Sequence, residues 1–136
     1  MAYLIDSDVL IWHLRGHQPT VQLLHSLAQK NDQEAQVLPL GCSVISVFEV
    51  LAGMRPGEKA GTERFLNSLE RYPVDEAIAK QAADYYQAFV KQGVTLHIAD
   101  LIIAATAVGH QLILVSYNQN HFPMEGIRIH RPMPEF

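Results

Sequence analysis

Residues 3–14 read Tyr-Leu-Ile-Asp-Ser-Asp-Val-Leu-Ile-Trp-His-Leu, in which a short apolar run meets two acids and then a second apolar stretch. The run 3–5 predicts a buried strand, and residues 7–14 predict a helix that Gly16 closes. The chain therefore turns directly from a strand into a helix at Asp6. In parallel sheets, ligands bind outside the carboxyl ends of strands, so this turn is a candidate for a functional site.

The same alternation of strand and helix continues along the chain. We expect further strands at 42–44, 71–74, 112–115 and, at an edge, 127–129, with an irregular approach over 37–41. One helical pattern begins at Pro19. Four more cover 45–54, 58–69, 75–92 and 96–108. Parallel neighbours need a crossover connection of this length, so the pattern predicts an α/β fold with a mostly parallel sheet.

Length and composition set the class of protein. The 136 residues predict a single domain spanning 1–136, and 49% hydrophobic against 18% charged residues excludes intrinsic disorder. One cysteine, Cys42, excludes a disulfide framework or cysteine-rich metal site, and we interpret it as a small core residue. We expect no membrane helix and no signal peptide, hence a cytoplasmic protein. The net charge of −4 argues against coating nucleic acid by bulk electrostatics.

Carboxylates stand alone in the apolar segments. Asp6 and Asp8 are the only Asp, Glu, Lys or Arg residues in 1–14, Glu49 is the only one in 35–54, and Asp100 is the only one in 92–124. Burying unpaired carboxylates costs several kcal/mol, and no basic residue lies nearby in sequence. We therefore predict that Asp6, Glu49 and Asp100 converge on a divalent cation, with Mg²⁺ or Mn²⁺ fitting oxygen ligands best.

A fourth corner of this site is predicted at 116–118, directly after the strand 112–115. Each residue also has a simpler interpretation: Asp6 or Asp100 as a helix cap, Asp8 as a first-turn acid, Glu49 as a solvent-facing residue, and Asn118 as a turn residue. The histidines form no metal-binding motif and are interpreted as structural or surface residues, although His97 could reach the site from the helical face of Asp100.

Four segments together carry a resemblance to a known family: LIDSDVLI at 4–11, SVFEVLAG at 46–53, IADLIIAATA at 98–107 and LVSYNQNHF at 114–122. In order and spacing, over essentially the whole chain, they resemble PIN domains, and specifically the VapC-type toxins of prokaryotic toxin–antitoxin pairs. The resemblance implies a three-layer α/β/α sandwich, an Mg²⁺- or Mn²⁺-dependent endoribonuclease, homodimerisation and inhibition by a VapB-type antitoxin.

Carried over by position, the resemblance makes Asp6, Glu49 and Asp100 the three site acids, with Asp6 and Asp100 as direct metal ligands. Asp8, Ser116 and Asn118 fill supporting positions. The amide of Asn118 stands where the family often has a fourth acid, which leaves open whether one or two metal ions bind.

Substrate and partner contacts are predicted more loosely. Arg15 and Arg55 each follow a helix that bears site acids and are candidates to hold RNA phosphates, whereas Lys59 and Arg64 fit surface residues better. An antitoxin groove is conceivable along apolar residues that also fit the core, namely Leu23, Leu24, Leu27, Phe48 and Leu51.

Three other functions stay open. The protein could be a PIN nuclease outside any toxin–antitoxin pair, a non-catalytic binding module, or a haloacid-dehalogenase-like phosphatase with the motif Asp6-Ser7-Asp8. The phosphatase motif calls for Thr or Val where this chain has Leu10. A purely structural module has no reason to bear the cost of clustered acids.

Overall fold

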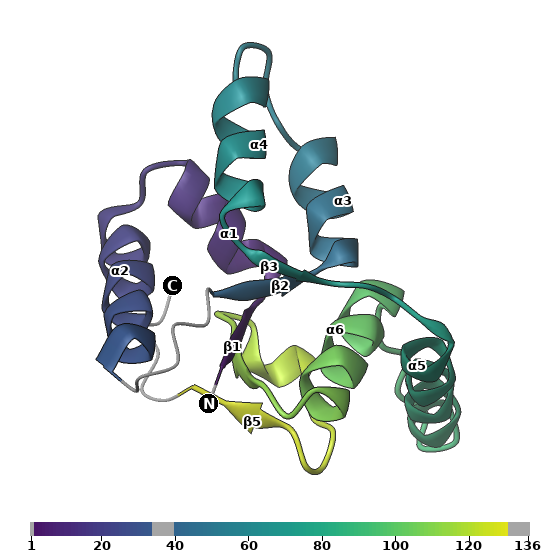
Figure 1. Ribbon diagram of the computed structural model, residues 1–136. Helices are drawn as coiled ribbons and strands as arrows, with labels where there is room; N and C mark the ends of the chain where they lie inside the picture. The colour runs from purple at the N-terminus through teal and green to yellow at the C-terminus, as the bar shows by residue number, and fades with distance from the viewer. Residues whose placement is uncertain (1, 34–39, 131–136) are drawn as a thin grey trace.

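A parallel sheet forms the centre of the computed structural model, which describes residues 2–33 and 40–130 (Figure 1). Its strands in the described residues are β1 (Tyr3–Ile5), β2 (Gly41–Ser43), β3 (Glu70–Tyr72), β4 (Ile113–Val115) and β5 (Arg128–Ile129). They lie in the order β3-β2-β1-β4-β5, and every neighbouring pair is parallel. The expected mostly parallel sheet is thus confirmed, and β1 occupies its middle.

Helices connect the strands. They are α1 (Ser7–Leu14), α2 (Gln18–Gln33), α3 (Val44–Ala52), α4 (Lys59–Asn67), α5 (Glu76–Val90) and α6 (Ile98–Gly109), with a 3₁₀ turn η1 (Gln119–His121) after β4. In Figure 1, α5 and α6 lie together on one side, α1 and α2 lie on the other, and α3 and α4 extend side by side from the sheet. Within residues 2–33 and 40–130, no helix combines the length and the apolar character needed to cross a bilayer.

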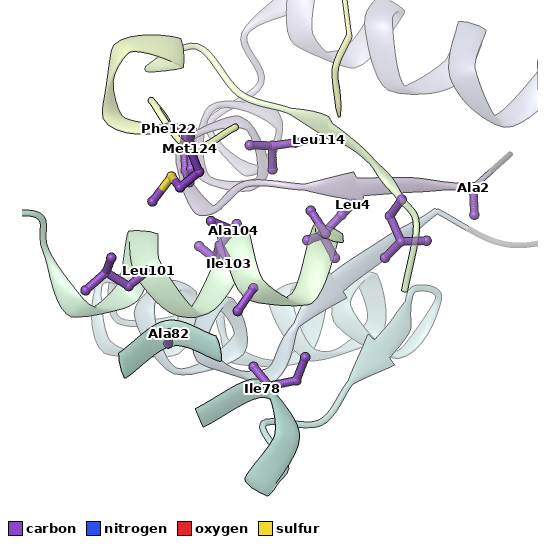
Figure 2. Packing of buried hydrophobic residues seen from close by; sticks show 13 residues of the cluster. Ala2, Leu4, Ile78, Ala82, Leu101, Ile103, Ala104, Leu114, Phe122 and Met124 are labelled. Atoms are coloured by element: carbon purple, nitrogen blue, oxygen red, sulfur yellow. The ribbon is translucent and has the colours of Figure 1, made fainter. Parts of the chain in front are cut away.

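Alternating residues of β1 separate two apolar cores. Leu4 packs with α5, α6 and β4 residues on one face, and Figure 2 shows Ile78, Leu101 and Leu114 gathered in that cluster. Ile5 packs on the other face with residues of α1, α2 and α4. Since successive strand residues point to opposite faces, one short strand serves both cores. The three-layer α/β/α architecture implied by the resemblance is confirmed.

Several boundaries differ from the expected ones because capping residues set them. Ser43 accepts a hydrogen bond from the Ile45 amide and caps α3, so Val44 is helical rather than part of β2. His97 caps α6, which begins at Ile98 and not at Leu96. Strand β3 stops before Pro73, and α3 ends at Ala52 rather than Met54. Of the irregular approach expected at 37–41, residues 37–39 lie outside the described residues.

Candidate active site

The predicted site lies at the carboxyl edge of the sheet, where β1 and β4 are neighbours. Asp6 directly follows β1, Ser116 directly follows β4, and the Asp6 amide donates to the Val115 carbonyl at 2.9 Å. The chain leaves β1 towards β2 on one side, while β4 lies on the other, so the strand order reverses here. Such a switch point is where open α/β sheets bind ligands.

Asp6 is the most deeply buried of the acids, with 5% of its surface exposed. Its Oδ1 accepts from the Ser7 amide at 2.7 Å, which makes it the cap of α1, and its Oδ2 accepts from Ser116 Oγ at 2.7 Å. Burial first, and then the charges of Asp8 and Asp100, raise the pKa of Asp6 well above its usual value, against the effect of the two hydrogen bonds. Asp6 is therefore both a helix cap and a carboxyl held among like charges.

Asp8 joins α1 to the segment that follows β4. Its Oδ1 accepts from the Val9 amide at 2.7 Å, and its Oδ2 accepts from the Tyr117 amide and from Asn118 Nδ2, each at 3.1 Å. Burial raises the pKa of Asp8, and the charge of Asp100 adds to the shift. The backbone amide of Asn118 donates in turn to Ser116 Oγ at 3.0 Å and so holds Asn118 in place.

Glu49 lies on α3 and contacts the first turn of α1 through the hydroxyl of Ser7, which is paired with that of Ser46. Ser7 Oγ donates to Glu49 Oε1 at 2.6 Å and lies 2.8 Å from Ser46 Oγ. Ser7 and Ser46 are both buried, whereas Glu49 is half-buried. The first turn of α1 therefore fixes the direction of the Glu49 carboxylate.

Asp100 stands in the first turn of α6 and does not cap it. His97 fills that position, with its Nδ1 accepting from the Ala99 amide at 3.2 Å. Burial raises the pKa of Asp100, His121 and His97 oppose the shift, and Glu49 adds to it. The imidazole of His121 faces this carboxylate, with its Nδ1 3.5 Å from Asp100 Oδ2.

The electrostatic interactions of the four acids link them to one another. In the described ranges, no lysine or arginine nitrogen comes within 4 Å of Asp6, Asp8, Glu49 or Asp100. The donor set is all carboxylate oxygen, with hydroxyl and amide support, which fits Mg²⁺ or Mn²⁺. As they stand there, no three His, Cys, Asp or Glu side chains are gathered in metal-ligand geometry. The chemistry of these side chains fits a hard cation.

The two predicted RNA-binding arginines are not brought to these acids. Arg15 is exposed at the C-terminal end of α1, about 12 Å along the helix from Ser7, and its Nη2 donates to the Gly53 carbonyl at 3.4 Å. Arg55 is exposed beyond the end of α3. Lys59 and Arg64 are exposed on α4, as expected for surface residues.

Three site residues were missed by sequence reasoning: Ser7, Ser46 and His121. Ser46 precedes Glu49 by three positions on one helix, a spacing that places both on the same face and is a usable signal. Ser7 stands between two site acids. His121 meets Asp100 only through the tertiary fold, and nothing in its local sequence points to that contact.

Comparison with known proteins agrees with this arrangement. The family model described as "PIN domain" matches residues 3–124. Ribonuclease VapC10 of Mycobacterium tuberculosis is 39% identical over 121 residues, which cover 89% of this chain and 86% of that protein.

Two solved structures have a similar fold. A chain of a toxin–antitoxin complex from Klebsiella pneumoniae is 25% identical, with a TM-score of 0.68 over 93% of this chain and 95% of that chain. A chain of VapBC2 from Rickettsia felis, bound to a DNA fragment from its promoter, has a TM-score of 0.80 at 18% identity, over 96% of this chain and 98% of that chain. The match of the PIN domain model over residues 3–124 places this chain in the PIN domain family, to which the 39% identity to Ribonuclease VapC10 adds a relative over most of the chain.

Proposed function

We propose that this protein is an endoribonuclease that hydrolyses phosphodiester bonds in RNA with Mg²⁺ or Mn²⁺, and that it is the toxin of a VapBC-type pair. One observation carries the proposal: Asp6, Asp8, Glu49 and Asp100 share the carboxyl edge of the sheet, and no described lysine or arginine lies within 4 Å of them. The similarity to Ribonuclease VapC10 supports RNA as the substrate. Family membership favours this function over the phosphatase alternative.

Asp6 and Asp100 are the proposed ligands of the cation, with Glu49 as a third acid and Asp8 in support. When bound, Mg²⁺ or Mn²⁺ would lower the pKa of the attacking water and neutralise charge that develops on the phosphate. The chain's own groups prepare the acids for this task. The Ser7 amide donates to Asp6 Oδ1 and Ser116 Oγ donates to Asp6 Oδ2. These two hydrogen bonds fix the direction of the remaining lone pairs on both oxygens.

Glu49 is the proposed proton acceptor. Ser7 Oγ holds Glu49 Oε1 at 2.6 Å, which orients the carboxylate for receiving a proton from water at the site. Asn118 Nδ2 and the Tyr117 amide hold Asp8 Oδ2 in the same way. These contacts fix the directions of the carboxylates before substrate binds. Charged groups that are already oriented lower a reaction barrier because they need not reorganise during the reaction.

The RNA backbone would extend from this edge towards Arg15 and Arg55, whose binding role stays a prediction. Because both arginines are exposed and neither forms an ion pair with a described site acid, they would contact phosphates away from the bond that is cleaved. Neutralising either one should reduce the salt dependence of RNA binding by about one phosphate contact without changing cation affinity. An unchanged salt slope removes that arginine from the RNA path.

The negative edge also suggests how a partner silences the enzyme. An arginine or lysine inserted by a VapB-type antitoxin would take the place of the cation among the acids. Of the apolar residues predicted for the groove, Leu24 and Leu27 are buried in the core, while Phe48 is 66% exposed and available to a partner. High Mg²⁺ should then compete with the antitoxin. The homodimer and the cytoplasmic location stay predictions.

Cleavage of single-stranded RNA tests the proposal. We expect activity with Mg²⁺ or Mn²⁺ and none in EDTA, with a loss of at least about 100-fold in Asp6→Asn and Asp100→Asn. Asp84→Asn, which changes an exposed acid on α5, serves as the matched control. Hydrolysis of p-nitrophenyl phosphate in place of RNA would support the phosphatase. Undiminished RNA cleavage in EDTA would contradict the metal-dependent mechanism.

A further inference from the structure

The segment 116–121 contacts each of the three aspartates of the candidate site, Asp6, Asp8 and Asp100. Ser116 Oγ donates to Asp6, Asn118 Nδ2 donates to Asp8, and His121 lies against Asp100. The aspartates come from two distant parts of the chain, the start of α1 and the start of α6. One short stretch after β4 therefore contacts all three.

This segment is held at both ends. At its start, Ser116 is fully buried and accepts from the Asn118 amide at 3.0 Å. At its end, the 3₁₀ turn is closed by the His121 amide on the Asn118 carbonyl at 2.9 Å. Phe122 and Met124 then enter the buried core beside α6. A backbone fixed in this way presents the His121 side chain from a defined position.

His121 meets Asp100 through one particular ring nitrogen. Its Nδ1 lies 3.5 Å from Asp100 Oδ2, so in the tautomer that protonates Nδ1 that N–H would face the carboxylate. The other nearby histidine, His97, already uses its Nδ1 to cap α6. The His121 side chain is 50% exposed, so replacing it opens no cavity in the core.

We propose that His121 is a positioning residue: through Nδ1 it orients the Asp100 carboxylate towards the cation, just as other residues of the segment 116–121 hold Asp6 and Asp8. The inference rests on the metal site of the proposed function. Groups that hydrogen-bond a metal-ligating carboxylate fix its direction, and their loss typically weakens metal binding or activity about 10–100-fold. Nothing in this role needs His121 to touch RNA or the cation.

Binding of Mn²⁺ to the full chain, measured by titration calorimetry, tests the role without relying on turnover. We expect His121→Leu to weaken Mn²⁺ binding about 10–100-fold. His121→Asn should restore most of the affinity, because its amide nitrogen stands close to the Nδ1 position, whereas His121→Gln mimics Nε2 and should not. His25→Gln, an exposed histidine on α2, is the matched control and should bind Mn²⁺ as the parent does.

RNA binding without metal provides a second readout, and we expect all four variants to match the parent in it. Unchanged Mn²⁺ affinity in His121→Leu would overturn the proposal, as would rescue by Gln but not by Asn. A loss of RNA binding with intact Mn²⁺ affinity would also overturn it and make His121 a phosphate contact. If the parent protein itself bound no Mn²⁺, the metal site of the proposed function would fail, and not the assignment of His121 alone.

Discussion

Asp6 combines burial with like charges, and this combination has a measurable effect on stability. Its pKa is raised well above 3.8 in the folded protein, whereas the unfolded chain restores the usual value. Between these two values the folded state binds more protons than the unfolded state. The free energy of unfolding therefore decreases as pH rises through that window, and it changes little below 3.8, where both states are protonated. Asp8 and Asp100 are shifted in the same direction.

We accordingly expect the metal-free protein to be more stable at mildly acidic pH than at neutral pH. Asp6→Asn should flatten this dependence and raise stability at neutral pH, because the amide keeps an acceptor for the Ser7 amide without the charge. Urea unfolding in EDTA at both pH values measures it, with Asp84→Asn as the control. Stability that falls on mild acidification, equally in parent and variant, would contradict the electrostatic account of Asp6.

Cys42 offers a second test at this scale. It is completely buried, and burial raises the pKa of its thiol to about 11. Because the thiolate is the reactive form, Cys42 should resist a thiol reagent such as iodoacetamide at neutral pH and react once the chain is unfolded. Mass spectrometry of native and urea-treated protein counts the modified thiol. Rapid labelling of the native protein would mean that β2 opens readily to solvent.

The candidate site acids are recognisable in the sequence because a carboxylate with no basic neighbour in an apolar segment is visible locally. Asp6, Glu49 and Asp100 stand out in this way, and the structure places them within electrostatic reach of one another, through Asp6 with Asp100 and Asp100 with Glu49. His121 could not be predicted by the same reasoning. Its contact depends on where a 3₁₀ turn after β4 meets α6, which is a property of the tertiary fold.

At the scale of elements, the hydrophobic pattern predicts each type of element and capping decides its ends. The apolar run at 42–44 predicts a strand, but the Ser43 hydroxyl accepts from the free Ile45 amide in the first turn of α3, so Val44 belongs to the helix. His97 caps α6 through the Ala99 amide and leaves Leu96, which the pattern predicts to be helical, before the helix. These hydrogen bonds depend on one side chain each, so periodicity does not detect them.

Gly41 in β2 is required by close packing against β3. A Cβ at this position would lie 2.5 Å from the Tyr72 ring and 3.2 Å from the Glu70 carbonyl, and that backbone oxygen cannot move aside easily. We expect Gly41→Ala to lower the free energy of unfolding by about 1–3 kcal/mol. Gly61 on α4 is the matched control: a Cβ added there would meet no neighbouring atom within 4 Å, so Gly61→Ala should stabilise by about 0.5–1 kcal/mol. Chemical denaturation compares the two, and equal effects would contradict the packing argument.

At the scale of the whole molecule, the fold assembles repelling charges from separate elements. Asp6 and Asp8 come with α1, Glu49 with α3 and Asp100 with α6, and the segment after β4 links three of them. The two apolar cores on either side of β1 hold these helix ends together despite the repulsion. Folding therefore brings carboxylates together whose mutual repulsion is relieved when a positive charge binds among them, which lowers the free energy of the folded state.

A cation that binds only the folded state must then stabilise the whole molecule. Linkage predicts a gain of about 2.7 kcal/mol when Mg²⁺ or Mn²⁺ is present at 100 times its dissociation constant. Thermal unfolding with Mn²⁺ and with EDTA measures this gain as a shift in Tm. Asp6→Asn and Asp100→Asn should lose most of the shift although each is at least as stable as the parent in EDTA, while Asp84→Asn should retain it. This reversal of order separates ligand loss from general damage to the fold, because a damaged fold would lower Tm in both conditions. An equal Mn²⁺ shift in all four proteins would place the cation away from this edge of the sheet.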